Sequence, residues 1–200
     1  MKNADANFSS QLKKSLFFLT VVLSACSHIE QPPRSTPWLP ENTPPNFHTT
    51  GKLSIKNDQQ GFQAGFAWDN ASWVKMIDIT TPLGSTVGRL CQDEMGATAQ
   101  NAKGQVFQAK TAGELAYRLT GQEIPLDYLD VWAMGRYSLD EPHQILPNGH
   151  LIQAGWTIER TTDEKNAPRR LILQRQNLKI TIVFKHFNAN YRTEYSQCPR

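Results

Sequence analysis

Apolar and polar residues alternate with a period of two along much of the chain after residue 50. Leu53 and Ile55 are separated by polar residues, and apolar residues occupy every second position from Phe62 to Trp68. This period is typical of β-strands that bury one face. Residues 57–61, which are polar and end in glycine, can form a turn between the two stretches. The pattern therefore predicts two neighbouring antiparallel strands.

Further short strands are predicted along the rest of the chain. Residues 73–79 form a third strand, and either of its faces can be the buried one, because both carry apolar side chains. Other predicted strands, each bounded by turn-forming residues, lie at 85–92, 97–100, 105–110, 151–153, 156–160, 170–175 and 178–187. This order of short strands and turns predicts an antiparallel meander.

A helical insertion interrupts the strands between residues 111 and 135. Thr111 and Glu114 have the spacing of a capping box at the start of a helix, and Gly121 can end that helix in the left-handed conformation. Pro125 favours the start of a second helical stretch that ends near Gly135. The predicted fold is mainly β: a strongly curved or barrel-like antiparallel sheet whose mouth is covered, or whose interior is filled, by the helices.

The first 26 residues have the parts of a lipoprotein signal peptide. Lys13 and Lys14 precede an apolar run at 16–25, and small residues precede Cys26. The run is only about half as long as a membrane-spanning helix. Residues 1–25 are therefore predicted to be cleaved, which leaves Cys26 with covalent N-acyl and S-diacylglycerol lipid and no other cofactor. The alternative is an ordinary secretory signal that happens to contain a cysteine.

Residues 26–46 are rich in proline and have little apolar periodicity. Such a segment favours extended backbone and acts as a spacer. We therefore predict a tether that begins at the lipidated cysteine and contributes no core residues. The single folded domain is predicted at residues 47–187, and residues 188–200 form a tail.

The charge of the chain excludes one class of partner. Of the 21 basic and 18 acidic side chains, three lysines and one aspartate lie in the predicted signal peptide, so the rest of the chain is close to neutral. Proteins that follow a phosphate backbone carry clustered lysine and arginine. The sequence has no such cluster, and we expect no nucleic-acid partner.

Two cysteines, Cys91 and Cys198, remain once Cys26 carries lipid. Exported proteins can form disulfides. A single pair without a dense spacing pattern is nevertheless a weak indication of a bridge. The sequence therefore favours two unpaired cysteines over a Cys91–Cys198 disulfide.

The sequence has none of the motifs that carry common enzyme chemistry. It has no nucleophile elbow, no phosphate-binding glycine loop and no paired metal-ligand spacing. Three pairs of adjacent carboxylates, Asp93-Glu94, Asp140-Glu141 and Asp163-Glu164, lie beside turn-forming residues, and neighbours on an extended chain point in opposite directions. We predict that these pairs are solvated turns, that the protein binds no metal, and that it is not an enzyme.

Large apolar residues of the predicted strands and helices would point to the inside of a curved sheet. They either form a plain hydrophobic core or, in part, line a ligand cavity. Pro82, Leu83 and Gly84 favour the cavity, because a turn between strands is usually polar and this one displays a leucine. Trp73 is among the large apolar residues that we predict to point to the inside of the sheet. The residues that we predict to line the cavity are Phe62, Phe66, Trp68, Ile77, Ile79, Leu90, Leu115, Leu119, Leu129, Trp132 and Trp156.

The turn at Thr80–Thr86 resembles the Pro-Leu-Gly loop of the LolB family of outer-membrane lipoprotein receptors. Other stretches are similar to segments of that family in the same order: Gly51–Ser54, Gly61–Trp68, Leu119–Leu126, Trp132–Gly135, Gly155–Ile158 and Pro168–Leu171. The resemblance runs from about Gly51 to Phe187. The chain departs from the family pattern at residues 136–137, at Phe187 and in the tail.

The resemblance implies a half-open antiparallel β-barrel with an α-helical lid and an apolar cavity. It implies a monomeric receptor, lipid-anchored through Cys26 on the periplasmic face of the outer membrane of a Gram-negative bacterium. Such a receptor accepts acylated lipoproteins from a LolA-like periplasmic carrier and inserts them into outer-membrane lipid without nucleotide hydrolysis. Pro82, Leu83 and Gly84 would form its membrane-insertion loop. The alternative is a structural or accessory lipoprotein with a plain core and no ligand.

Overall fold

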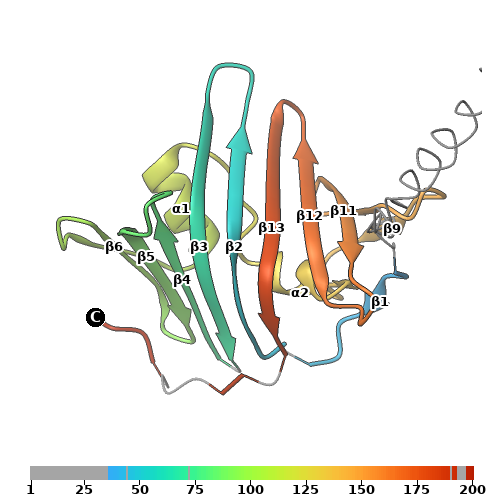
Figure 1. Cartoon of the computed structure of the whole chain (residues 1–200), viewed down its shortest axis with the longest axis horizontal. Helices are drawn as coiled ribbons and strands as arrows, with labels where there is room; N and C mark the ends of the chain where they lie inside the picture. Colours follow the sequence, from blue (N-terminus) through green and yellow to red (C-terminus); the bar gives the residue numbers. More distant parts are fainter. Residues whose placement is uncertain (1–35, 44, 72, 190, 193–196) are drawn as a thin grey trace, which may run out of the picture. The chain divides into compact units, whose positions relative to one another are not determined.

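The computed structural model describes residues 36–43, 45–71, 73–189, 191–192 and 197–200. Within these residues the chain forms an antiparallel sheet of 11 strands, two helices and a separate pair of two-residue strands (Figure 1). The predicted signal peptide, Cys26 and residues 27–35 lie outside the described part of the chain. Signal cleavage and lipidation therefore stay predictions.

The strands of the sheet follow the chain in two runs that meet where β2 pairs with β13. The first run is β2 (Phe47–Lys56), β3 (Gly61–Ala71), β4 (Val74–Thr80), β5 (Thr86–Asp93), β6 (Gly96–Asn101) and β7 (Val106–Ala109). The second is β13 (Leu178–Asn188), β12 (Pro168–Arg175), β11 (Trp156–Thr162), β10 (Leu151–Gln153) and β9 (His143–Ile145). The mainly β, antiparallel architecture is confirmed. The sheet is open, because the edge strands β7 and β9 do not pair with each other, and whether it curves into the predicted half-open barrel stays a prediction.

One face of the sheet is apolar across many strands, because paired residues of neighbouring strands point the same way. Phe66 pairs with Ile79 and Trp68 pairs with Ile77, so these large side chains share a face. Leu90 continues the row, since it pairs with Ile77 from the other side. We call this the inner face of the sheet and the opposite one the outer face.

β4 turns Lys75 to the inner face, which settles the orientation that the sequence left open. Trp73, predicted to point inward, lies just before β4 and is 67% exposed. Lys75 is buried, and its Nζ donates to the Leu126 carbonyl at 3.0 Å and to the Asp130 Oδ1 at 3.0 Å. The paired charge therefore fixes the segment before the second helix on the sheet.

Both helices, α1 (Ala112–Thr120) and α2 (Leu129–Ala133), pack on the inner face. α1 lies on β5, β6 and β7, and α2 lies next to β11 and β8 (Arg136–Tyr137). The predicted ends of α1 are confirmed: Thr111 Oγ1 accepts the Glu114 N–H at 3.1 Å, and Gly121 has a φ of 69°. The second helix is shorter than predicted, because the residues directly after Pro125 form a turn.

Residues 36–43 pack on the domain instead of forming a free tether. Trp38 is buried, and its Nε1 donates to the Gly149 carbonyl at 2.9 Å. The short strand β1 (Leu39–Pro40) pairs in parallel with β8. The prediction that residues 26–46 contribute no core residues is therefore wrong. A single tryptophan among prolines produces no periodic signal, so the sequence pattern could not reveal this contact.

Arg160 joins this N-terminal segment to the end of α2. Its Nε donates to the Ala133 carbonyl at 2.7 Å, its Nη1 to Thr36 Oγ1 at 2.6 Å, and its Nη2 to the Asn166 carbonyl at 3.1 Å. Burial lowers the pKa of the Arg160 guanidinium to about 10. The side chain remains charged at neutral pH, and its donors hold three separate segments together.

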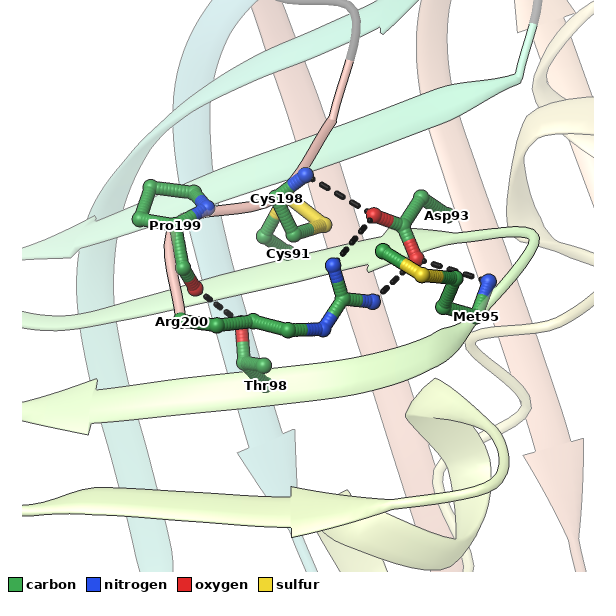
Figure 2. A network of polar contacts seen from close by, with 7 residues as sticks. All are labelled: Cys91, Asp93, Met95, Thr98, Cys198, Pro199 and Arg200. Atoms are coloured by element: carbon green, nitrogen blue, oxygen red, sulfur yellow. Dashed lines mark hydrogen bonds and ion pairs between the residues drawn. A yellow bond between two sulfur atoms is a disulfide. The ribbon is translucent and has the colours of Figure 1, made fainter.

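Residues 198–200 lie on the outer face of β5 and β6, where they form what we call the tail clamp with Cys91, Asp93 and Thr98 (Figure 2). Cys91 and Cys198 form a disulfide with their Cα atoms 5.6 Å apart, so the bridge that the sequence indicated only weakly is present. Spacing could not reveal the bridge, because 107 residues separate the two cysteines. The clamp also covers an apolar part of the outer face, formed by the β4 residues Val74 and Met76.

Asp93, which the sequence predicted to lie in a solvated turn, is instead the electrostatic centre of the tail clamp, with only 5% of its side chain exposed. Its carboxylate accepts the Cys198 N–H at 2.8 Å and two N–H groups of Arg200 at 2.6 and 3.0 Å. These hydrogen bonds, above all those from Arg200, lower the pKa of Asp93 from 3.8 to about 2. The clamp is therefore closed by a charged pair as well as by the disulfide.

We expect Asp93→Asn to remove an acid-sensitive part of the stability. Because folding lowers the pKa of Asp93, its carboxylate stabilises the folded protein above about pH 4, and this contribution is lost as the pH falls toward 2. The melting temperature of the wild type should exceed that of Asp93→Asn at pH 7, and the difference should shrink below pH 4. Circular dichroism of both proteins between pH 2 and 7 measures this, with Asp58→Asn as control. A difference that is equal at every pH would contradict the assignment.

Candidate ligand-binding groove

An apolar groove lies between the inner face of the sheet and the helical part of the chain. Its volume is about 710 Å³, within the range of roughly 300–1,000 Å³ that ligand pockets occupy. The walls come from β2 to β7, β13, α1 and residues 122–129, and the accessible lining is almost entirely apolar. The groove is partly open to solvent, so a long apolar ligand can enter it from the side.

Strand alternation brings the large apolar residues of neighbouring strands into this groove. Phe66 and Trp68 of β3 face it together with Ile77 and Ile79 of β4, because the pairing of the two strands places them on the same face. α1 contributes Ala116, Leu119 and Thr120, and Leu119 is 45% exposed. Two layers of the fold therefore enclose one apolar space.

The structure brings most of the predicted cavity residues together along the groove. Those that line it are Phe62, Phe66, Trp68, Ile77, Ile79, Leu90, Leu119 and Leu129. Phe62 is 49% exposed, so it lies at the rim. The placement of these residues agrees with a ligand site, and whether they hold acyl chains stays a prediction.

Leu115, Trp132 and Trp156 do not line the groove, and their predicted place is corrected here. Leu115 is fully buried between α1 and β6. Trp132 is fully buried, and its Nε1 donates to Gln153 Oε1 at 2.9 Å. Trp156 belongs to the main core. The period of a helix or strand shows which residues share a face, but not whether that face meets a core or a cavity.

Other residues line the groove that the sequence did not single out. They come mainly from β2, β13 and the segment before α2, and they include Leu53, Ile55, Phe107, Ile124, Leu126, Ile180 and Ile182. The alternation that identified β2 and β13 as strands also showed which of their residues share a face. It did not show that these residues line one groove, because only the pairing of β13 with β2 places the two strands side by side.

The groove is electrically neutral. Among its described lining residues only Arg89 carries a charge, and its Nε and Nη2 donate to the Asp78 carboxylate at 2.6 and 2.8 Å. The remaining polar lining residues are asparagine, glutamine and threonine. Such a lining provides no pair of groups for acid–base chemistry and suits an apolar chain.

The loop between β4 and β5 extends one wall of the groove. Ile79 lines the groove near the end of β4, and Leu83, four positions later, is 95% exposed. The Gly84 N–H donates to the Thr81 carbonyl at 2.9 Å, and the Thr81 N–H donates to the Ser85 carbonyl at 2.8 Å. Gly84 has a φ of 91°, which favours glycine. The loop is therefore a closed turn that displays a leucine, as the sequence predicts.

Among the described residues, no helix is long and apolar enough to cross a membrane. The same residues contain no group of three histidine, cysteine or carboxylate side chains placed to bind a metal ion.

An open sheet with a neutral apolar groove on its inner face is typical of proteins that bind hydrophobic ligands. The family model described as outer membrane lipoprotein LolB matches residues 45–187. The chain therefore belongs to the LolB family.

Curated relatives support this assignment over most of the chain. The outer-membrane lipoprotein LolB of Neisseria meningitidis serogroup A is 41% identical over 179 residues, which cover 89% of this chain and 92% of that protein. The LolB of Vibrio campbellii is 29% identical over 192 residues, with 86% and 95% covered. The solved LolA superfamily protein NE2245 of Nitrosomonas europaea has a TM-score of 0.44 and 10% identity, over 77% of this chain and 90% of that one, a similarity too low to add to the assignment. The prediction that the chain is not an enzyme agrees with this family.

Proposed function

We propose that this protein is an outer-membrane receptor for lipoproteins. In this proposal the lipid on Cys26 holds the protein on the periplasmic face of the outer membrane of a Gram-negative bacterium. The groove accepts the acyl chains of a lipoprotein from a LolA-like periplasmic carrier, with α1 and residues 122–129 as its lid. The lipoprotein then passes into the outer membrane, and no nucleotide is consumed.

The observation that supports the proposal most is the neutral apolar lining of the groove. Moving one methylene group out of water gains about 0.8 kcal/mol. A protein with three acyl chains therefore needs a shielded path across an aqueous compartment. A groove whose single charged lining residue is ion-paired accepts such chains without desolvating a free ion.

The transfer runs downhill in free energy at each step, because nothing in the proposal supplies energy from a nucleotide. The receptor must bind the acyl chains more tightly than the carrier does, and the bilayer must bind them more tightly than the receptor. A groove that is partly open to solvent shields an acyl chain less completely than a bilayer. This difference favours release into the membrane.

The exposed leucine at position 83 suits the release step. Burial of one leucine side chain gains roughly 1.5–3 kcal/mol, which is too little to anchor a domain but enough to bias which end of the sheet meets the bilayer. Because the loop continues the strands beyond Ile79, its contact with lipid would bring the groove next to the acyl region.

The alternative is a structural or accessory lipoprotein whose apolar interior binds nothing. A plain core would leave no space for a ligand, whereas this fold retains a groove of about 710 Å³. Saturable binding of an apolar probe distinguishes the two. We therefore favour the receptor.

The proposal is tested with the whole protein reconstituted in lipid vesicles. A radiolabelled lipoprotein bound to its periplasmic carrier is added, and the label is followed from the carrier to the receptor and then into the vesicle lipid. We expect transfer far above that of vesicles without the protein. Equal transfer in the two samples would contradict the proposed function.

A further inference from the structure

Different parts of the chain hold β5 and β6 from the two faces of the sheet. Along these strands successive side chains alternate, so Cys91 and Thr98 point to the outer face while Gln92 and Ala99 point to the inner face. The outer face carries the tail clamp (Figure 2), and the inner face carries α1 (Figure 1). The same two strands therefore connect the clamp to a helix of the groove.

On the outer face the tail clamp contacts both strands. The disulfide to Cys198 and the carboxylate of Asp93 hold β5, as Figure 2 shows. The Thr98 hydroxyl of β6 donates to the Pro199 carbonyl at 3.4 Å. Cys91 and Cys198 are both buried, so the bridge is shielded from solvent. The clamp is a fixed part of this wall of the protein.

On the inner face α1 depends on the same strands. The Ala112 N–H at the start of α1 donates to Gln92 Oε1 at 2.8 Å, and Gln92 lies between Cys91 and Asp93 in sequence. Leu115 of α1 packs with Ala97 and Ala99 of β6 in a small buried cluster, which is separate from the main core. The position of α1 is therefore set mainly by strands close to one edge of the sheet.

Strands near an edge open more readily than central ones, because fewer neighbours hold them. β6 pairs with β7, and β7 is a four-residue edge strand. In the described residues the outer face of β5 and β6 is supported by residues 198–200. Loss of that support leaves this wall of the groove held by the inner layer and by the pairing of β5 with β4.

We infer that the tail clamp positions α1 through β5 and β6 and so sets the width of the groove. Cys198, Arg200 and Asp93 are then positioning residues, because they act on the groove without touching it. The expected effect of the tail clamp on ligand binding rests on the proposed function. The expected effect of the tail clamp on the position of α1 does not depend on any ligand.

The test compares backbone hydrogen exchange in the whole protein, reconstituted in lipid vesicles, for the wild type and two clamp variants. Cys91→Ser/Cys198→Ser removes the bridge, and Arg200→Ala keeps the bridge but removes the ion pair. We expect amide exchange in α1, β5 and β6 to rise at least tenfold in the double variant and less in Arg200→Ala, with β12 and β13 unchanged. Arg200→Lys, which retains a positive charge, should restore part of the protection.

Leu171→Ala serves as the matched control, because Leu171 is fully buried in β12, away from α1. It should raise exchange in β12 and β13 and spare α1. Wild-type exchange of α1 in both clamp variants would overturn the inference. So would a uniform rise across the sheet, since it would show that the clamp stabilises the whole fold and positions nothing.

A second measurement uses the same proteins and separates this inference from the proposed function. We expect a fluorescent fatty acid to dissociate several-fold faster from the double variant than from the wild type. An unchanged dissociation rate together with faster exchange of α1 would overturn the link to the groove. If the wild type does not bind the probe at all, the proposed function fails, and hydrogen exchange alone decides whether the clamp positions α1.

Discussion

Ile79→Asp should reduce the affinity of the protein for a fluorescent fatty acid by about 100-fold or more. Ile79 is half-buried in β4 and lines the groove. A carboxylate there must either lose its hydration or take up a proton when an acyl chain lies beside it, at a cost of about 3 kcal/mol or more. Fluorescence titration of the whole protein in lipid vesicles, corrected for partition of the probe into lipid, measures the affinity.

Val183→Asp is the matched control for this variant. Val183 is 41% exposed on the outer face of β13, so the same chemical change there leaves the groove intact. We expect wild-type affinity in Val183→Asp. Equal losses in both variants would mean that the substitutions act through general instability, and no loss in Ile79→Asp would show that the probe binds elsewhere.

Leu83→Glu should separate acceptance of a lipoprotein from its delivery. The residue is 95% exposed in a closed turn, so the substitution leaves the fold and the groove unchanged. It replaces a leucine that gains free energy in the bilayer by a carboxylate that loses it. We expect normal transfer from the carrier to the receptor, followed by at least a tenfold slower transfer of the label into the vesicle lipid.

Trp73→Glu is the control for delivery. Trp73 is also a large exposed residue beside a turn, but it precedes β4, whereas Leu83 follows it, so the two lie at opposite ends of the strand. Delivery should be normal in Trp73→Glu. Normal delivery by Leu83→Glu would exclude the loop from the release step, and loss of the first transfer would place Leu83 at the contact with the carrier.

Local patterns were sufficient to predict most strands and one helix. Alternation from Phe62 to Trp68 identified both a strand and its inner face, and Thr111 with Gly121 marked the ends of α1 within one residue. The exposed leucine at position 83 followed from turn chemistry alone. These features depend on residues that are close together in the sequence, so one sequence is sufficient to predict them.

Features that depend on distant pairings were not predictable in the same way. Whether the sheet closes is decided by the two edge strands, which lie far apart in the chain. The Cys91–Cys198 bridge joins positions 107 residues apart. Trp38 gave no periodic signal, although it is buried in the core. Leu115 and Leu119 share one helix face, but only the packing of α1 shows that the first meets the core and the second meets the groove.

A sheet that does not close has two edges, and each edge exposes backbone groups that another chain could pair with. Here β7 has four residues and β9 has three. Edges this short offer a second copy only a few hydrogen bonds, far fewer than the 11-residue strands β3 and β13 could offer. Copies crowded together on a lipid surface would therefore find no long template for adding strands to one another, and the open architecture is compatible with a high surface density of separate molecules.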